Sequence, residues 1–476
     1  MSDGADQPQE QTTPPGRPTH ETGNAVSVTG PFFQRADWLS FGLTAVVVLV
    51  VYLRTLAPEV TLEYSGILAT SAKYVGVAHP LGFPVWTLYS WLFVTLLPFS
   101  NIAWRVALGS AVAAALACGL VALMVSRAGT LLLETTPAFT SRKLAEQQLL
   151  RVVCGCVAGL ALGLSRTVWR MGVVAEIWAV SVLLFAIMLC FLMRWTGRPE
   201  GRRFLYGALF VFGLLLTSNQ ELFVMTPALL LLVILSNQEL GRDLCLVISL
   251  LAVADWALSA LGLCRWPGSY MLASVGLLVA FLLVGIAAVV AIVRTRRFGS
   301  EWKPASLCGV LFLMGLGVYL CLPFASMTNP PVNWGYPRTP EGFFHVLTRG
   351  QYEHWHPTDE LGRFIGQLWI VVKDTGAGFG WPYFVFALLP LGLLRRTGGC
   401  ARNWLLGLTA ALVCVGPLMV TLLNPSNDLA SVELIAPYFS AMYVVLAVWT
   451  GLGFMVFGSL VTKPWMQPRP DTTPCL

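Results

Sequence analysis

Residues that can exchange protons or bind anions gather in the stretch Ala57 to Pro84, where Glu59, Glu63, Lys73 and His79 follow one another. They stand out because only 11% of the 476 residues are charged. A carboxylate can take a proton from an attacking hydroxyl group, and a histidine can bind phosphate or assist a proton transfer. The stretch directly follows a long apolar segment, so we expect it to emerge at a membrane surface and to build a site there.

Glu63 and His79 each allow two interpretations. Glu63 stands just before apolar residues at helical spacing, which predict a helix lying on the bilayer: Tyr64, Ile67, Leu68, Ala72 and Val75. A carboxylate at that place either caps the helix or accepts a proton during catalysis. His79 precedes Pro80, which favours an extended conformation, and it serves either the turn itself or the site.

A second polar stretch begins near Asn329 and carries two arginines, Arg338 and Arg349. Guanidinium groups grip phosphate well, so both are candidates for a phosphate site. The aromatic side chains in the same stretch could stack on a sugar or anchor the loop at the interface. As sugar-binding or acceptor-binding candidates this stretch supplies Asn333, Trp334, Gln351 and Tyr352.

Three further candidates lie at the ends of apolar segments. Arg105 opens the second predicted span and could neutralise a phosphate. Glu176 could bind sugar or acceptor, or it could simply pair with Arg166 or Arg170. Asn219 lies between two short apolar segments, and broken helices of this kind often line cavities in membrane proteins.

Composition sets the fold class. Hydrophobic residues make up 56% of the chain, and long apolar runs recur along it, which predicts an all-α polytopic membrane protein. The net charge of +6 therefore reflects basic cytoplasmic loops and indicates no nucleic-acid partner. No zinc or disulfide framework is visible among the 11 cysteines, and neither a metal nor a cofactor is expected.

We predict a disordered tail over residues 1–36, a transmembrane domain over 37–460 and a second tail over 461–476. The apolar segment 85–97 is bracketed by prolines and is only about 20 Å long as a helix, so it should lie at the interface, anchored by Trp86, Tyr89 and Trp91. Twelve spans remain, at 38–57, 102–125, 149–165, 174–193, 204–218, 222–236, 244–262, 270–293, 305–323, 381–394, 404–423 and 437–458.

The distribution of Lys and Arg sets the predicted orientation. With 85–97 outside the membrane, most of the 30 basic residues fall on one side, which the positive-inside rule assigns to the cytoplasm. Both termini are then cytoplasmic. The loops 57–101 and 324–380 face outward, and 57–101 holds the interfacial helices.

Six short motifs extend through most of the chain: Ser65-Gly66, Val77–Pro84, Ala103–Val106, Val174–Trp178, Asn329–Gly335 and Arg349–Tyr352. In this order they resemble the GT-C superfamily of polyprenol-dependent membrane glycosyltransferases. More narrowly, the chain is similar to bacterial relatives of the eukaryotic transmembrane protein O-mannosyltransferase that modifies IPT domains. The resemblance implies a GT-C-like bundle of about twelve transmembrane helices.

The chain departs from this family at two places. Where the family has Asp-Ser-Gly-Glu in the first outer loop, this sequence has Tyr64-Ser65-Gly66-Ile67, and Glu63 lies one residue earlier. The family's Leu-Pro-x-Arg becomes Leu322-Pro323-Phe324-Ala325, so an expected arginine is absent.

The resemblance implies an inverting glycosyltransferase that moves a sugar, plausibly mannose, from a polyprenyl-phosphate donor to a hydroxyl group of a protein or glycan. It would act on the outer face of a bacterial cytoplasmic membrane, with Glu63 as the base, His79 as a helper, and Arg105, Arg338 and Arg349 at the phosphate. Because the family carboxylates are replaced, an inactive lipid-phosphate-binding protein of the same fold is an alternative. A transporter or flippase of lipid-linked substrates is another, although no repeated halves are evident.

Overall fold

The apolar segments fold into helices because backbone groups in lipid must hydrogen-bond within the chain itself. The computed structural model describes residues 31–62, 64–135, 143–260, 285–286, 289–297, 299–349, 357–394, 397–426 and 429–461. Throughout these ranges the regular structure is helical, without a strand, and one isolated β-bridge joins Val77 to Asn333. The predicted all-α class is confirmed.

Seven helical stretches in the described ranges are long and apolar enough to cross a membrane. Four are α1 (Arg35–Thr55), Ile102–Leu131 within α4 (Ile102–Thr135), α6 (Leu144–Gly163) and α8 (Trp178–Gly197). The fifth, Trp302–Met327, joins α14 (Trp302–Leu316), η2 (Gly317–Leu320) and α15 (Cys321–Met327). The sixth, Gly399–Leu423, joins α19 (Gly399–Val413), η5 (Cys414–Leu418) and α20 (Met419–Leu423). The seventh, Glu433–Ser459, combines parts of α21 (Leu429–Ile435) and α22 (Ser440–Val461) with η6 (Ala436–Phe439). The protein is thus a multi-pass α-helical membrane protein.

The remaining helices are shorter or less apolar: α2 (Ser65–Tyr74), α3 (Pro84–Leu96), α7 (Arg166–Gly172), α9 (Arg203–Leu216), η1 (Gln220–Met225), α10 (Thr226–Ser236), α11 (Gln238–Ala260), α16 (Pro340–Leu347), α17 (Leu361–Thr375), η3 (Gly376–Gly380), α18 (Trp381–Phe386) and η4 (Leu389–Leu393).

The predicted number of twelve spans is not confirmed. Residues 204–218 and 222–236 form short helices, and 381–394 is divided between α18 and η4. Most of 270–293 lies outside the described residues, as do most of the two predicted tails.

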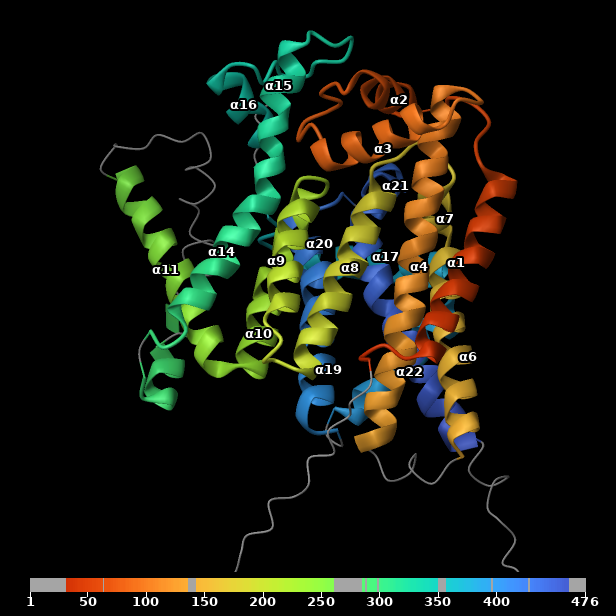
Figure 1. The fold of residues 1–476 in the computed structure, drawn as a ribbon, viewed down its shortest axis with the longest axis vertical. Coiled ribbons are helices and arrows are strands. Elements are labelled where there is room, and N and C mark those ends of the chain that lie inside the picture. The colour runs from red at the N-terminus through yellow and green to blue at the C-terminus, as the bar shows by residue number, and fades with distance from the viewer. Residues whose placement is uncertain are drawn as a thin grey trace, which may run out of the picture. The chain divides into compact units, whose positions relative to one another are not determined.

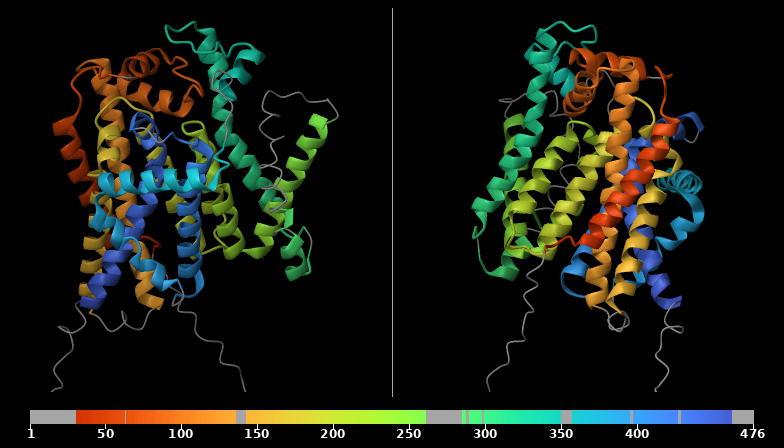
Figure 2. Two further views of the ribbon diagram at one scale, coloured as in Figure 1. Left: turned by 180° about the vertical axis from the view of Figure 1, so that it is seen from behind. Right: turned by 45° about the vertical axis from the view of Figure 1, so that its right-hand side comes forward.

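The N-terminal helices pack into one bundle. Helix α1 contacts α4 and α6, α4 also contacts α8, and α22 lies against α6 and α4 (Figures 1 and 2). Small residues let α4 and α6 approach closely, because a Cβ atom at Gly159 would lie 2.5 Å from the Cys118 carbonyl oxygen. Without a hydrophobic driving force between helices in lipid, such close packing is a main source of their association.

A buried charge pair connects α1 to α6. Asp37 Oδ1 lies 2.6 Å from Arg151 Nη2, and both side chains are almost completely buried. Ser126 on α4 donates a hydrogen bond of 2.5 Å to the same carboxylate oxygen, and Arg151 Nε donates to the Ser126 carbonyl. Three helices therefore meet at one carboxylate whose charge is fully partnered.

Helices α2 and α3 lie across the ends of the long helices rather than along them (Figures 1 and 2). Helix α3 has 13 residues, which agrees with the predicted short helix over 85–97. Its side chains hold it to the bundle: Trp86 Nε1 donates to the Glu176 carbonyl, and Tyr89 donates to the Gly109 carbonyl, each at 2.9 Å. Trp86 is fully buried, so the prediction that it anchors the interface was wrong. The indole can be buried in the protein because its N–H group donates to the Glu176 carbonyl.

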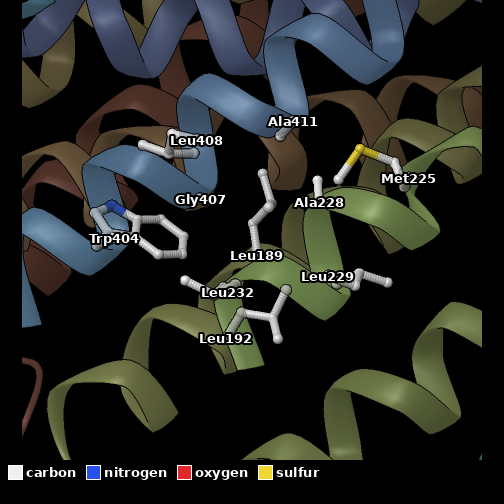
Figure 3. Close-up of a pocket in the computed structure, with 10 residues that line it drawn as sticks. All are labelled: Leu189, Leu192, Met225, Ala228, Leu229, Leu232, Trp404, Gly407, Leu408 and Ala411. Atoms are coloured by element: carbon white, nitrogen blue, oxygen red, sulfur yellow. The ribbon is translucent and has the colours of Figure 1, made fainter. Parts of the chain in front are cut away.

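Helices α8, α10 and α19 meet at an apolar contact that leaves a gap of only about 10 Å³ (Figure 3). Leu189, Met225 and Trp404 are among its lining side chains, and no ionisable group joins them. This contact is tightly packed core and offers no room for a ligand.

We expect Asp37→Asn to destabilise the protein by about 3 kcal/mol, because Arg151 would keep its charge in a buried place without a carboxylate. Thermal unfolding in detergent, followed by tryptophan fluorescence, measures the effect. The control is Glu301→Gln, which breaks the more exposed pair with Arg202 and should cost less than about 1 kcal/mol. Equal shifts in the two variants would contradict this account.

Candidate functional site

A cavity of about 1140 Å³ lies where several irregular segments meet. From the first half of the chain, its wall includes residues before and after α2, helix α7 with the segment to Trp178, and the turn between α9 and η1. From the second half it includes Arg349, which follows α16, and parts of α17, η3, α21 and η6. Cavities of this size hold ligands as large as a sugar with an attached phosphate. Two clusters of ionisable groups lie on the wall, one around Arg349 and one around Arg166.

The turn His79 to Pro84 brings the first loop to the cavity. The Gly82 amide donates to the His79 carbonyl at 2.5 Å, and Leu81, Gly82 and Phe83 all have positive φ, at 93°, 68° and 43°. Backbone hydrogen bonds of 3.0 Å from Val77 to the Val332 carbonyl and from Trp334 to the Val77 carbonyl pair this loop with the second one. The two predicted outer loops thus form one connected structure beside the cavity.

His79 is half-buried among aromatic rings. Its ring centre lies 5.0 Å from that of Tyr64 and 5.7 Å from that of Trp334. Burial lowers the pKa of His79 below its ordinary 6.5, and the positive charge of Arg349 lowers it further, although a hydrogen bond with the Pro80 backbone acts the other way. The imidazole is therefore neutral at pH 7 and can accept a proton.

The first cluster is centred on Arg349. Its guanidinium forms an ion pair with Glu221, which belongs to η1 and is buried, and it also donates a hydrogen bond to the Tyr438 hydroxyl. Burial by itself would lower the pKa of Arg349, but the Glu221 carboxylate and Tyr438 raise it overall. The arginine stays charged, and its charge is compensated by Glu221.

The second cluster lies on the wall made by α7, α17 and α21. Arg166 pairs with Glu433 at 3.6 Å, and both side chains are largely exposed. Burial raises the pKa of Asp374 on α17, Glu433 raises it further, and Arg166 lowers it. Arg170 and Glu176 also line the cavity. The cavity wall thus carries two exposed arginines, Arg166 and Arg170, together with the carboxylates of Glu176, Asp374 and Glu433.

Of the predicted site residues, His79, Glu176 and Arg349 line the cavity. Glu63 lies outside the described residues, but its chain neighbours Leu62 and Tyr64 are both on the wall. Gln351 and Tyr352 also lie outside the described residues.

The other predicted residues take different places. Arg105 donates three hydrogen bonds to the carbonyls of Val94, Phe99 and Ser100, which fixes the loop after α3. Arg338 is held by Asn329 at 2.8 Å and lies over the Tyr336 ring. Neither arginine lines the cavity.

Asn333 donates to the Ser326 carbonyl at 3.2 Å and so stabilises its own loop, while Trp334 packs near His79. Asn219 is buried next to the cavity-lining Ser218. Of these three residues, Asn219 and Trp334 lie next to side chains of the cavity wall, and Asn333 lies in the loop paired with Val77.

Several residues of the wall were not predicted, among them Ser218, Glu221, Asp374 and Glu433. Glu221 carried a usable signal, because it is an ionisable residue between two apolar segments. Asp374 and Glu433 carried none, since charged residues of amphipathic loop helices usually face water. Their position depends on how α17 and α21 pack.

Fold and cavity together define a class: a multi-pass α-helical membrane protein with a charged cavity walled by its loops and loop helices. Within it, residues 65–241 match the family described as "Protein O-mannosyl-transferase TMEM260 N-terminal domain". Protein O-mannosyl-transferase TMEM260 of Mus musculus is 30% identical over 130 residues, which is 27% of this chain and 16% of the mouse protein. No solved structure is significantly similar to the chain.

The resemblance to protein O-mannosyl-transferases that the motifs indicated is therefore confirmed over residues 65–241, which are similar to this N-terminal domain. The matched region contains His79, Arg170, Glu176 and Glu221. Arg349 and the carboxylates Asp374 and Glu433 lie beyond it. One part of the cavity wall thus comes from the shared region and the other part does not.

We expect Gly82→Ala to distort the turn that carries His79. Its φ of +68° is strained for alanine, and the added Cβ would lie 2.7 Å from Leu322 Cδ2. The loss of stability should be roughly 1–3 kcal/mol in thermal unfolding. Gly66→Ala is the matched control, because it lies in α2 and its Cβ would meet only Val60 at 3.4 Å. Equal melting temperatures of the two variants would refute the role of the turn.

We also expect His79 to make the protein less stable in acid. Its pKa is lowered in the folded state, so the unfolded chain binds the proton first as the pH falls below about 6.5, and stability drops from there. The melting temperature of His79→Gln should fall less between pH 7 and pH 5 than that of the unchanged protein. Parallel pH profiles would contradict the lowered pKa.

Proposed function

We propose that this protein is a membrane glycosyltransferase, which moves a sugar such as mannose from a polyprenyl-phosphate donor to a hydroxyl group of a protein or glycan. The observation that carries the proposal is the cavity of about 1140 Å³, whose wall combines residues of the region matched to an O-mannosyl-transferase with a neutral histidine and several carboxylates and arginines. Group transfer between two substrates needs a site of this size and polarity.

The proposed reaction inverts the anomeric carbon. The acceptor oxygen attacks that carbon from the face opposite the phosphate, the carbon–oxygen bond to the phosphate breaks, and polyprenyl phosphate leaves with the electron pair. Glu63 takes the acceptor proton; both of its chain neighbours line the cavity. His79 is close to this place through its contact with Tyr64 and can assist, since it is neutral.

The leaving phosphate requires positive charge. Among the predicted phosphate ligands, only Arg349 lines the cavity, and Glu221 already compensates its charge. Arg166 and Arg170 on α7 are exposed, and the pair of Arg166 with Glu433 at 3.6 Å is screened by water and weak. These two arginines are therefore the better partners for a phosphate. Apolar wall residues such as Leu423, Leu434 and Ile435 offer a surface for the start of the polyprenyl chain. In this scheme the lipid-linked sugar is a co-substrate, and no cofactor is required.

The proposed setting is a bacterial cytoplasmic membrane, with the cavity on its outer face and both termini in the cytoplasm. The supporting observation is the distribution of basic residues along the sequence. The membrane itself, the donor and the acceptor are the proposed partners.

A second function has its own support. The family's acidic motif is replaced by Tyr64-Ser65-Gly66-Ile67, which favours a protein of the same fold that binds a lipid phosphate without transferring the sugar. This alternative predicts donor binding but no product with any acceptor.

We expect Glu63→Gln to reduce the rate of transfer by about 10²–10⁴ while the protein stays folded, because the acceptor hydroxyl would lose its base. The purified protein is incubated with polyprenyl-phosphate mannose and candidate acceptors, and the products are measured by mass spectrometry. Glu59→Gln removes an exposed carboxylate of the same loop and serves as the control.

Two outcomes would change the conclusion. Unchanged turnover by Glu63→Gln would remove Glu63 as the base. Donor binding without product from the unchanged protein would support the inactive alternative.

A further inference from the structure

The Arg349 end of the cavity has an unusual composition for a phosphate site. Arg349 and Glu221 form a buried pair, and the side chains are 19% and 2% exposed. His79 is near enough for the arginine to lower its pKa, and it is neutral at pH 7. The described groups at this end therefore carry no net charge.

Charge compensation works against an anionic ligand here. A phosphate would have to compete with Glu221 for the guanidinium, and it would place its own negative charge next to a buried carboxylate. Repulsion between like charges is strong where water is excluded. Removing Glu221 from Arg349 would leave a buried carboxylate unpaired, which is costly.

Buried polar side chains without a hydrogen-bond partner in the described part of the chain lie close in sequence to Glu221 of the Arg349–Glu221 pair. Ser218 lines the cavity and is completely buried, and its hydroxyl has no hydrogen-bond partner among the described residues. The neighbouring Asn219 is 1% exposed, and neither its amide nitrogen nor its oxygen has a partner there. Buried polar groups in native proteins are nearly always hydrogen-bonded. Of the two residues, Ser218 lines the cavity, so a ligand there would supply the partner that the described residues do not give its hydroxyl.

A sugar ring matches this set of groups. Its hydroxyls can donate to the Glu221 carboxylate and accept from the Arg349 guanidinium, and Ser218 can do either. Two cavity-lining aromatic side chains, Trp178 and Tyr438, pack edge to face at 4.6 Å, and Tyr438 also accepts from Arg349. Aromatic rings beside a carboxylate and a hydroxyl suit a neutral, amphipathic ligand.

We infer that Ser218, Glu221 and Arg349 bind the sugar ring of the donor, and that its phosphate lies toward α7. The inference rests on the proposed function for the identity of the donor, and it changes the role of Arg349 from phosphate ligand to sugar ligand. It adds Glu221 and Ser218 as sugar-binding residues. Sugar specificity then depends on this end of the cavity.

Binding of a simple glycoside tests the assignment without any catalysis. Methyl α-D-mannopyranoside is added to the purified full-length protein in a detergent without a sugar headgroup, and saturation-transfer NMR measures binding. We expect a signal from the unchanged protein, a loss of roughly tenfold or more in affinity for Glu221→Gln, and a smaller loss for Ser218→Ala. Inorganic phosphate should not displace the glycoside.

Matched controls separate the site from general effects on folding. Glu301→Gln breaks another Arg–Glu pair away from the cavity, and Ser181→Ala removes another buried hydroxyl without a partner in the described ranges. Both should keep the glycoside signal. Glu221→Asp keeps the negative charge and should retain more glycoside binding than Glu221→Gln. If the two variants melt at the same temperature, this difference in binding does not come from a loss of folding.

The assignment is overturned if the glycoside gives no signal, if Glu221→Gln binds it as the unchanged protein does, or if phosphate displaces it. These outcomes are distinct from failure of the proposed function. Glycoside binding that depends on Glu221, without any transfer from a lipid donor, would leave the sugar site standing and remove the transferase. Sugar transfer together with glycoside binding that does not depend on Glu221 would support the transferase and remove the sugar site.

Discussion

A backbone amide or carbonyl group in the hydrocarbon of a bilayer finds no water to bond with, and this constraint organises the protein. Long segments meet it as helices. Outside the long helices, irregular segments also bond to one another: Ala57 donates to the Val173 carbonyl, Val77 to Val332 and Thr358 to Thr421, each at 2.9–3.0 Å. Loops that are far apart in the sequence are therefore tied together in pairs. The cavity lies among these tied segments, where polar backbone and charged side chains can be accommodated.

The arginines show how the same residue type serves different purposes. Arg151 is neutralised by Asp37 between three helices, and Arg242 by Asp243, so both stabilise the scaffold. Arg105 makes bonds only to backbone carbonyls among its described contacts, and it holds a loop in place. Arg349 pairs with Glu221 at the cavity wall, and among the arginines that the structure describes it combines burial with access to a ligand-sized space. The partner decides the role in each case, because a buried charge must be matched locally.

The acidic groups of the cavity come from widely separated parts of the chain. Four carboxylates, Glu176, Glu221, Asp374 and Glu433, line the cavity. Two of them, Asp374 and Glu433, come from beyond the segment that matches the O-mannosyl-transferase domain. Acidic groups that hold hydroxylated ligands can therefore be supplied by parts of the chain outside the shared segment, provided that the helices bring them to the same space.

The sequence by itself determined the all-α membrane class, the short helix α3, the helix α2 and the family resemblance over residues 65–241. Apolar runs, flanking prolines and short motifs are local features, which can be recognised from neighbouring residues in the sequence. Of the site residues predicted from the sequence, His79, Glu176 and Arg349 line the cavity. The sequence could not tell that Arg105 binds carbonyls or that Trp86 is buried, nor pair Glu221 with Arg349 across 128 positions. Those outcomes were decided by the tertiary structure, because the partner of a charged or polar side chain depends on which distant segments the packing of the helices brings beside it.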